Sequence, residues 1–139
     1  KAKSVLRQFD EEVTDEQAAE AYSDRAGIFA EFGKIICISV GLVYRDKDSK
    51  KLSVRLKSFA DDDEQKLLQD FSELLNQHYN HPARHNLCGH NIREFDVPYV
   101  CRRMLVNQLP LPALLDIAGK KQWETKQLID TLEFWKVGD

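Results

Sequence analysis

One short stretch, residues 88–96 with the sequence CGHNIREFD, concentrates the side chains that could do chemistry. It places a glycine and two hydrogen-bonding side chains, His90 and Asn91, at the end of a predicted strand. A carboxylate, Asp96, follows at the start of a predicted helix. In open α/β sheets, ligands bind beyond the carboxyl ends of the strands, where a carboxylate can hold a hard cation. Alternatively Asp96 caps its helix, which from composition alone is the commoner role for an aspartate at this position.

Two predicted strands and a predicted helix precede this stretch. Residues 34–44, KIICISVGLVY, are rich in β-branched residues and carry apolar groups on both faces, which is typical of a central strand. A polar turn over residues 45–50 leads into a second strand, which predicts a hairpin with one solvent-facing side on that strand, as at a sheet edge. The alternating apolar set of this strand is Leu52, Val54 and Leu56, and the polar set is Ser53, Arg55 and Lys57. The helix that starts at residues 61–63 has one core-facing stripe, formed by Leu67, Leu68, Phe71, Leu74 and Leu75.

Helices and short strands are also predicted around and after the central stretch. A strand near residues 85–89 is followed by a helix that begins close to Asp96, because Pro98 is tolerated only in a first turn. We expect its buried side to carry Phe95, Tyr99, Val100, Met104 and Leu105. A short helix ending at Gly119 and a strand ending at Asp130 complete the series. Two antiparallel strands followed by helix, strand, helix and strand predict an α/β domain with a mixed sheet flanked by helices.

The first 33 residues differ from the rest. They carry a surplus of acidic groups, and the pair Thr14 and Gln17 has capping-box spacing, which predicts a helix over residues 15–25 that ends near Gly27. We therefore divide the chain into an acidic helical N-terminal segment, residues 1–33, and an α/β core, residues 34–139.

Composition excludes several classes of protein. A chain of 139 residues with 42% hydrophobic and 31% charged residues is an ordinary one-domain globular chain, and no apolar run is long enough to cross a membrane. The formal net charge of −3 shows no basic surplus for binding nucleic acid directly, although it permits an enzyme that meets phosphates through metal ions. Three cysteines at unpatterned spacings predict reduced thiols and a cytoplasmic location.

The spacing Asn91-x-x-x-Phe95-Asp96 resembles the second motif of the ribonuclease H-like, DEDD-type 3′-to-5′ exonucleases. The surroundings look most like the group related to the exonuclease domain of family B DNA polymerases. The resemblance covers nearly everything from Ala26 onward, in the order of residues 26–41, 88–104, 111–124 and 128–139.

The resemblance implies a role for each matching residue. Asp96 would be the catalytic, metal-binding aspartate of the motif, Phe95 would lie against the terminal nucleotide, and Asn91 and His90 would contact the substrate strand or support the site. Asp130 and Thr131 resemble an Asp-Thr pair at the end of a later strand, which we interpret as structural or substrate-side. The implied activity is removal of nucleotides from a single-stranded nucleic-acid 3′ end with two Mg²⁺ or Mn²⁺ ions, which suit carboxylate ligands.

The chain departs from this family in its acidic motifs. Four acidic residues are needed, and only one of the motifs lies in this sequence: an Asp-x-Glu strand would precede Lys1, and a Tyr/His-x(3-4)-Asp helix would follow Asp139. The letters at residues 10–12 and 62–64 fit Asp-x-Glu, but both lie in polar stretches and we discount them. We therefore expect the first strand and the last helix to be missing from this chain, and the chain by itself to be inactive.

Other interpretations remain open. Without the first strand, residues 34–44 would present an unpaired edge, which favours self-association or filling by another element. A ribonuclease H-like module that binds nucleic acid or protein without cutting is the main alternative to an enzyme. A zinc site is a weaker alternative, because its candidate ligands match no paired spacing: His78, His81, His85, Cys88 and His90.

Overall fold

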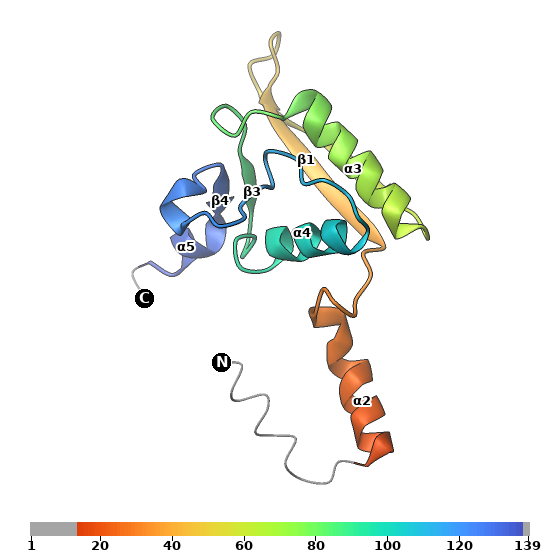
Figure 1. The fold of residues 1–139 in the computed structure, drawn as a ribbon. Helices are drawn as coiled ribbons and strands as arrows, with labels where there is room; N and C mark the ends of the chain where they lie inside the picture. The colour runs from red at the N-terminus through yellow and green to blue at the C-terminus, as the bar shows by residue number, and fades with distance from the viewer. Residues whose placement is uncertain (1–13, 138–139) are drawn as a thin grey trace. The chain divides into compact units, whose positions relative to one another are not determined.

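The structure is a computed structural model that describes residues 14–137, in two units that are treated separately, up to Gly33 and from Lys34. The boundary at residue 34 is also where the helical spacing of apolar residues gives way to the alternating spacing of the first predicted strand. The first unit contains α2, Asp15–Arg25, with Asp15 and Glu16 in its first turn where the helix dipole favours negative charge, followed by the 3₁₀ turn η2, Ala26–Ile28 (Figure 1). The helix predicted over residues 15–25 is confirmed.

The second unit begins with the predicted hairpin. Strands β1, Cys37–Arg45, and β2, Leu52–Ala60, pair antiparallel over their whole length, from Cys37 opposite Ala60 to Arg45 opposite Leu52. The turn between them is held by Asp46, whose Oδ1 accepts the backbone N–H groups of Asp48 and Ser49 at 3.1 and 2.7 Å. An aspartate that binds the backbone two and three residues ahead fixes a tight turn, as the polar sequence indicated.

The faces of the hairpin are the reverse of the prediction. Leu52, Val54 and Leu56 are 69, 59 and 78% exposed, and Val43 on the same face is also exposed. The opposite face carries Phe59, which is buried against Phe71 of the following helix with the ring centroids 5.7 Å apart. The hairpin therefore packs on the helix through the face that was expected to meet solvent, and its more regular apolar face is uncovered in the described part of the chain.

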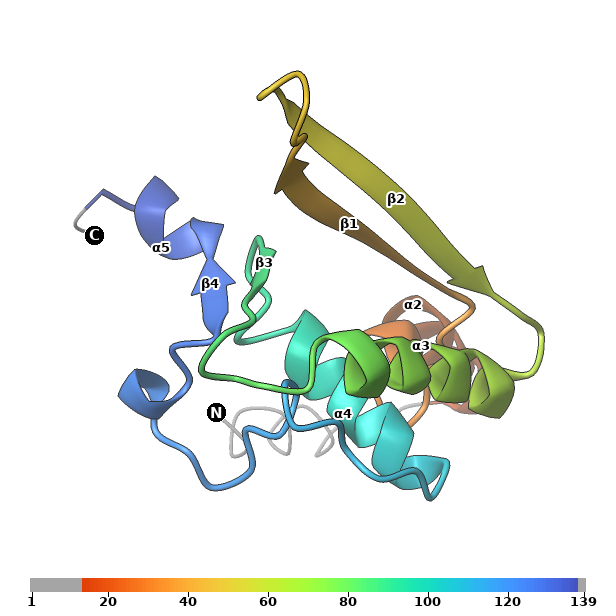
Figure 2. The ribbon, with the colours of Figure 1, turned by 90° about the horizontal axis from the view of Figure 1, so that it is seen from above.

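Helix α3, Glu64–His78, and helix α4, Asp96–Val106, supply most of the core (Figure 2). The N-cap of α3 is Asp63, which accepts the N–H groups of Gln65 and Lys66. Helix α4 begins at the predicted residue, with Pro98 in its first turn. The predicted stripe of α3 is buried apart from Leu74, which is partly buried, but of the five residues expected to be buried around α4 two are exposed, Phe95 and Leu105.

The predicted short helix before Gly119 is wrong. Residues 110–119 form two separate turns: Pro112 O accepts from Leu115 N and Asp116 N, and Ile117 O accepts from Lys120 N. Proline has no N–H to donate, so Pro110 and Pro112 remove donors from the segment that was expected to be helical. The side chains of Leu114 and Leu115 are buried in the core, so the apolar residues of this segment belong to the core although they do not form the predicted helix.

Two short parallel strands complete the fold. Strand β3, Leu87–Gly89, pairs with β4, Leu128–Asp130, and β4 leads directly into the short helix α5, Thr131–Trp135; the 3₁₀ turn η3, Gln122–Glu124, lies before β4. Within residues 14–137 the strands form two separate two-stranded sheets, β1–β2 and β3–β4, and not the single mixed sheet that was predicted. The α/β class is confirmed, and among the described residues β1 is hydrogen-bonded to β2 alone.

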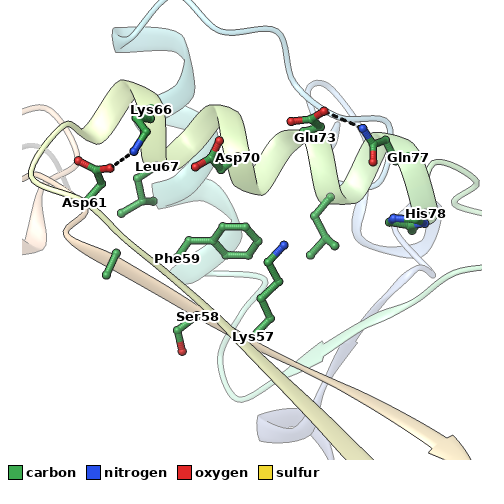
Figure 3. A pocket seen from close by; sticks show the side chains of 12 residues that line it. Lys57, Ser58, Phe59, Asp61, Lys66, Leu67, Asp70, Glu73, Gln77 and His78 are labelled. Atoms are coloured by element: carbon green, nitrogen blue, oxygen red, sulfur yellow. Dashed lines mark hydrogen bonds and ion pairs between the residues drawn. The ribbon is translucent and has the colours of Figure 1, made fainter.

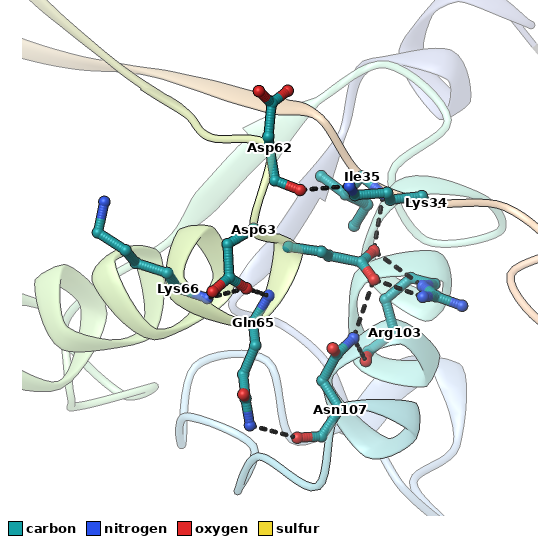
Figure 4. A network of polar contacts seen from close by, with 9 residues as sticks. Lys34, Ile35, Asp62, Asp63, Gln65, Lys66, Arg103 and Asn107 are labelled. Atoms are coloured by element: carbon teal, nitrogen blue, oxygen red, sulfur yellow. Dashed lines mark hydrogen bonds and ion pairs between the residues drawn. The ribbon is translucent and has the colours of Figure 1, made fainter.

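One ion pair is buried between α3 and α4. Arg103 donates to both carboxylate oxygens of Glu64, with 2.9 Å from Nε to Oε1, and the two residues are 8 and 6% exposed. Asn107 Nδ2 and the backbone N–H of Ile35 also donate to Glu64, at 3.0 and 2.7 Å (Figure 4). Glu64 therefore ties the chain just before β1 to the two helices, and the letters of residues 62–64 belong to a helix start and not to a metal-binding strand. The similar letters at residues 10–12 lie outside the described residues.

No helix in the described part of the chain is long and apolar enough to cross a membrane.

Candidate functional site

The predicted site residues gather at one edge of the β3–β4 sheet. His90 and Asn91 follow β3, and Asp130 ends β4 with Thr131 directly after it. Because the strands are parallel, their carboxyl ends lie side by side and bring residues 39 to 42 positions apart into contact. The loop after β3 leads directly to Asp96, which lies at the start of α4.

Asp130 holds the loop after β3. Its Oδ1 accepts the backbone N–H groups of Asn91 and Leu132 at 2.7 and 3.0 Å, and its Oδ2 accepts that of Arg93 at 3.1 Å. Asp130 is buried, which by itself raises the pKa of its carboxyl, but these three N–H groups and the nearby His90 outweigh burial and leave the pKa below its ordinary value. Of the two roles suggested for Asp130, the contacts favour the structural one.

Thr131 fixes the orientation of His90. The hydroxyl of Thr131 donates to Gly89 O at 3.1 Å, and His90 Nδ1 lies 3.1 Å from the hydroxyl oxygen of Thr131. Since the single hydroxyl hydrogen points to Gly89, the imidazole donates through Nδ1, which leaves Nε2 as an acceptor in the neutral ring. His90 is exposed, so Nε2 is accessible to a ligand.

Asn91 has an unusual backbone and an unpaired side-chain oxygen. Its φ of 61° lies in the left-handed region, which asparagine tolerates better than most residues. Its Oδ1 is buried and accepts no hydrogen bond from any residue that the structure describes. A buried acceptor without a partner is uncommon, and it marks this amide as a group that a ligand or a water molecule can satisfy.

Gly89 allows the close approach of Ile92. A Cβ at Gly89 would lie 2.1 Å from Ile92 Cγ2, and Ile92 is buried. We expect Gly89→Ala to lower the free energy of unfolding by about 1–3 kcal/mol, because the buried Ile92 must move out of its place. Urea unfolding measures this change.

Gly41→Ala is the matched control for Gly89→Ala, because a Cβ there meets only the exposed end of Leu56 at 3.2 Å and Val54 at 3.5 Å. An equal loss of stability in the two variants would show that a glycine-to-alanine change in a strand, and not the contact with Ile92, is responsible.

Asp96 does not cap its helix. The N-cap of α4 is Phe95, which makes no side-chain cap hydrogen bond, and Asp96 is the first residue of the helix. Its carboxylate is exposed and forms no hydrogen bond or ion pair with the residues that the structure describes. The capping interpretation is therefore wrong, and the carboxylate is available to a ligand.

Five of the predicted site residues line two separate hollows, and Thr131 lines neither of them. A groove of about 460 Å³ between β1 and β3 is lined by His90, Phe95 and Asp96 among others. A second hollow of about 310 Å³ is lined by Asn91 and Asp130. Phe95 is 44% exposed, so its ring is accessible, in contrast to the prediction that it is buried and in agreement with a contact to a ligand.

The structure assembles no complete metal centre from the described residues. Within them, no group of three or more His, Cys, Asp and Glu side chains could hold a metal ion. The histidines of the zinc alternative make ring contacts instead, with the His81 and His85 centroids 6.4 Å apart and the Tyr79 and His85 centroids 5.4 Å apart. Asp96 is thus a single hard oxygen donor, which fits Mg²⁺ or Mn²⁺ in type but supplies only part of a coordination shell.

A further hollow lies away from these residues. It has a volume of about 490 Å³ and is formed between β2 and α3 (Figure 3). Several of its polar groups have partners within the fold: Lys66 pairs with Asp61, Gln77 donates to Glu73 at 2.7 Å, and Lys57 lies 4.7 Å from the centre of the Phe59 ring. None of the residues predicted for the site lines this hollow.

Sequence inspection missed one residue that shapes the site. Arg93 donates from Nε to Leu128 O at 3.0 Å and from a terminal nitrogen to Glu133 at 3.3 Å, so its guanidinium links the loop after β3 to β4 and α5. Its partners lie 35 and 40 residues away, and no local spacing points to them.

Comparisons with protein-family models, with curated proteins and with solved structures find no match. A functional interpretation therefore rests on the residues and their geometry: an accessible carboxylate, an accessible imidazole nitrogen and a half-exposed aromatic ring along one groove.

Proposed function

We propose that the complete protein is a metal-dependent 3′-to-5′ exonuclease with a ribonuclease H-like fold, acting on single-stranded nucleic-acid ends. The observation that carries the proposal is Asp96: an exposed carboxylate that has no partner among the described residues, at the first turn of a helix, on a groove beside the carboxyl end of β3. A carboxylate that its own fold does not use is available for a cation, whereas a carboxylate that caps a helix is not.

The surrounding residues have roles that suit this reaction. The half-exposed ring of Phe95 can stack on the terminal base, and stacking of this kind tolerates any base. His90 can accept a hydrogen bond through Nε2, and Asn91 can donate from its side-chain amide. Asp130 and Thr131 support the site by holding the loop that carries His90 and Asn91. Two bound Mg²⁺ or Mn²⁺ ions would activate water and stabilise the leaving oxygen in such an enzyme.

The 139-residue chain alone is inactive in this proposal. One carboxylate cannot hold two divalent ions, and the described residues offer no other acidic group beside Asp96 in the groove. In this proposal the remaining ligands come from outside the residues that the structure describes. The three cysteines are unpaired, as a cytoplasmic location would require.

The test uses the protein expressed from its longest open reading frame, with single-stranded DNA and RNA labelled at the 5′ end. We expect Mg²⁺-dependent shortening from the 3′ end, and we expect Asp96→Ala to reduce its rate about a hundredfold, as loss of a metal ligand should. The two substrates in parallel identify the nucleic acid.

Glu94→Ala is the matched control, because Glu94 is exposed, acidic and two residues from Asp96, but does not line the groove. Its activity should equal that of the unaltered protein. Full activity of Asp96→Ala would contradict the proposal, and so would Mg²⁺-dependent digestion by the 139-residue chain alone.

A module that binds without cutting is the second candidate, favoured by the single carboxylate in the described part of the groove. It predicts that the complete protein retains nucleic acid or a protein partner with no shortening of the 3′ end, and that Asp96→Ala leaves this retention unchanged.

A further inference from the structure

The loop before β4, residues 119–126 with the sequence GKKQWETK, presents a tryptophan to solvent. Trp123 is 66% exposed, although tryptophan is highly buried on average in folded proteins. It belongs to the 3₁₀ turn η3, and Figure 2 shows this turn at the start of β4, at the opposite end of the strand from α5. The ring is therefore available to a ligand at a place separate from the groove that Asp96 lines.

The loop is fixed by hydrogen bonds although its tip is exposed. The backbone N–H of Lys121 donates to Glu124 Oε2 at 2.7 Å, and Glu124 N donates to Lys121 O at 2.9 Å, which closes the turn around Trp123. Thr125, at the end of the turn, is buried, and its carbonyl accepts from Leu128 N at 3.0 Å, so the turn is joined directly to β4. A ring that is held in place before binding loses little conformational entropy when a ligand contacts it.

Cationic groups surround the exposed ring. The three exposed lysines of the loop are Lys120, Lys121 and Lys126, and the Nζ atom of Lys121 lies 5.0 Å from the centre of the Trp123 ring. The only acidic residue of the loop is Glu124, whose carboxylate accepts from a backbone N–H. The whole chain has no basic surplus, but three lysines against one glutamate give this loop a formal charge of +2.

A hollow extends from this loop to the candidate site. It is the hollow of about 310 Å³ described above, and it is lined by Lys120 and Thr125 of the loop, by Leu128 of β4 and by Asn91 after β3. Because the loop lies at the start of β4 and Asn91 is bonded at its end, the hollow follows the strand. A long ligand that contacts Trp123 can therefore continue along β4 toward Asn91.

Single-stranded nucleic acid matches both the ring and the charges, and we propose that residues 119–126 bind it, with Trp123 stacked on a base and the lysines beside neighbouring phosphates. Bases stack on an aromatic ring whatever their identity, and positive groups beside the ring bind the backbone. An acidic peptide supplies anions but no comparable flat ring. The contact lies apart from Asp96, and it applies equally to an enzyme and to a module that binds without cutting.

The test measures binding in EDTA, so that no metal-dependent cleavage can occur. The probes are fluorescein-labelled oligothymidylate and an abasic oligonucleotide of the same length and charge, each titrated with the 139-residue chain and followed by fluorescence anisotropy. We expect the abasic probe to bind about tenfold more weakly, because it has phosphates but no bases. Trp123→Leu should weaken binding of oligothymidylate about tenfold and leave binding of the abasic probe unchanged.

Trp135→Leu is the matched control for the stacking contact. Trp135 is 79% exposed, but it belongs to α5 and not to the loop. Its replacement should leave the affinity for both probes unchanged. Thermal unfolding of the two variants checks that each remains folded.

The dependence of binding on salt tests the lysines. Three phosphate contacts predict a slope of about −2 when the logarithm of the binding constant is plotted against that of the salt concentration, at about 0.7 for each phosphate of a single strand. Lys126→Gln should make this slope shallower by about 0.7. Lys47→Gln changes an exposed lysine in the turn between β1 and β2, and it should leave the slope unchanged.

Three results would overturn the proposal. Equal affinity for the two probes, or no binding of oligothymidylate at low salt, would show that the loop does not stack on a base. An equal loss of affinity in Trp123→Leu and Trp135→Leu would show that the contact is not specific to the loop. Binding to phosphatidylserine vesicles that is lost in Trp123→Leu, with no binding of oligothymidylate, would assign the loop to a membrane surface instead. None of these readouts depends on nuclease activity, so the proposed function is tested separately.

Discussion

Replacing Arg103 by methionine should lower the free energy of unfolding by about 3–5 kcal/mol at neutral pH, because it leaves the Glu64 carboxylate buried without its cation. Glu64 is 6% exposed, and Arg103 satisfies both of its oxygens. The hydrogen bonds from Asn107 and from the backbone of Ile35 remain, but neither carries a charge. Urea unfolding followed by circular dichroism measures the loss.

Two further variants separate the buried charge from general damage. Lys66→Met breaks the exposed pair with Asp61 and should leave stability nearly unchanged, since exposed ion pairs contribute little. Adding Glu64→Leu to Arg103→Met removes the unpaired charge as well, and it should recover much of the lost stability. A double variant as unstable as Arg103→Met alone would contradict the explanation.

The loss should also depend on pH. Burial raises the pKa of Glu64, but the hydrogen bonds from Arg103, Ile35 and Asn107 outweigh it and leave the pKa below its ordinary value. A carboxyl with a lowered pKa stabilises the fold above its unfolded pKa, about 4.3, and this contribution is lost as the pH falls through the folded pKa. In Arg103→Met only the smaller hydrogen bonds oppose burial, which raises the pKa of Glu64, so the difference between the two proteins should shrink as the pH falls toward about 4.3 and continue to shrink below it.

Replacing Asp130 by alanine should lower the free energy of unfolding by about 3 kcal/mol, because three backbone N–H groups lose their acceptor together. These groups belong to Asn91, Arg93 and Leu132, so the loop after β3 and the first turn of α5 are released at once. Urea unfolding gives the stability, and hydrogen exchange of the amides of Asn91 and Arg93 reports the loop directly. Both amides should exchange faster than in the unaltered protein.

Asp130→Asn tests the geometry of this interaction. The amide keeps one oxygen, which can accept from Asn91 and Leu132, but its NH₂ group then faces the N–H of Arg93. Its stability should lie between those of the alanine variant and the unaltered protein. Asp116→Ala is the control, because Asp116 accepts only a long bond from Ala118 N at 3.3 Å. Unchanged exchange at Asn91 and Arg93 in Asp130→Ala would contradict the structural role of the carboxylate.

The sequence predicted the elements whose signals are local. The helix over residues 15–25, the helix with the stripe from Leu67 to Leu75, and the start of α4 near Pro98 all follow from spacing within one element. The face of the hairpin was predicted wrongly because alternation says only that two faces differ. Which face is covered depends on where α3 packs. Phe59, near the end of β2, packs against Phe71 of α3, so the face that carries Phe59 is the covered one.

The sequence predicted which residues would lie near one another in the candidate site, but it did not predict the contacts that each of them makes. A strand end and a helix start pointed to His90, Asn91 and Asp96, and the family resemblance pointed to Asp130 and Thr131. Parallel pairing of β3 with β4 places four of these five residues together. The sequence did not show which residue each side chain contacts. The carboxylate of Asp130 accepts a hydrogen bond from a loop 39 residues earlier, and Glu64 pairs with Arg103, 39 residues later. Separations of this size leave no periodic trace in a single sequence.

The hydrogen bonds that Asp130 accepts from the loop after β3 also mean that this loop can be fixed only late in synthesis of the chain. The hairpin, α3 and α4 have all left the ribosome once residue 106 has emerged, but the core also needs Leu114, Leu115 and Leu128. The backbone of residues 91–93 acquires its acceptor only when residue 130 emerges. In a nascent chain halted before that point the loop after β3 would lack this anchor, so the region around Asp96 can be completed only after β4 has been made.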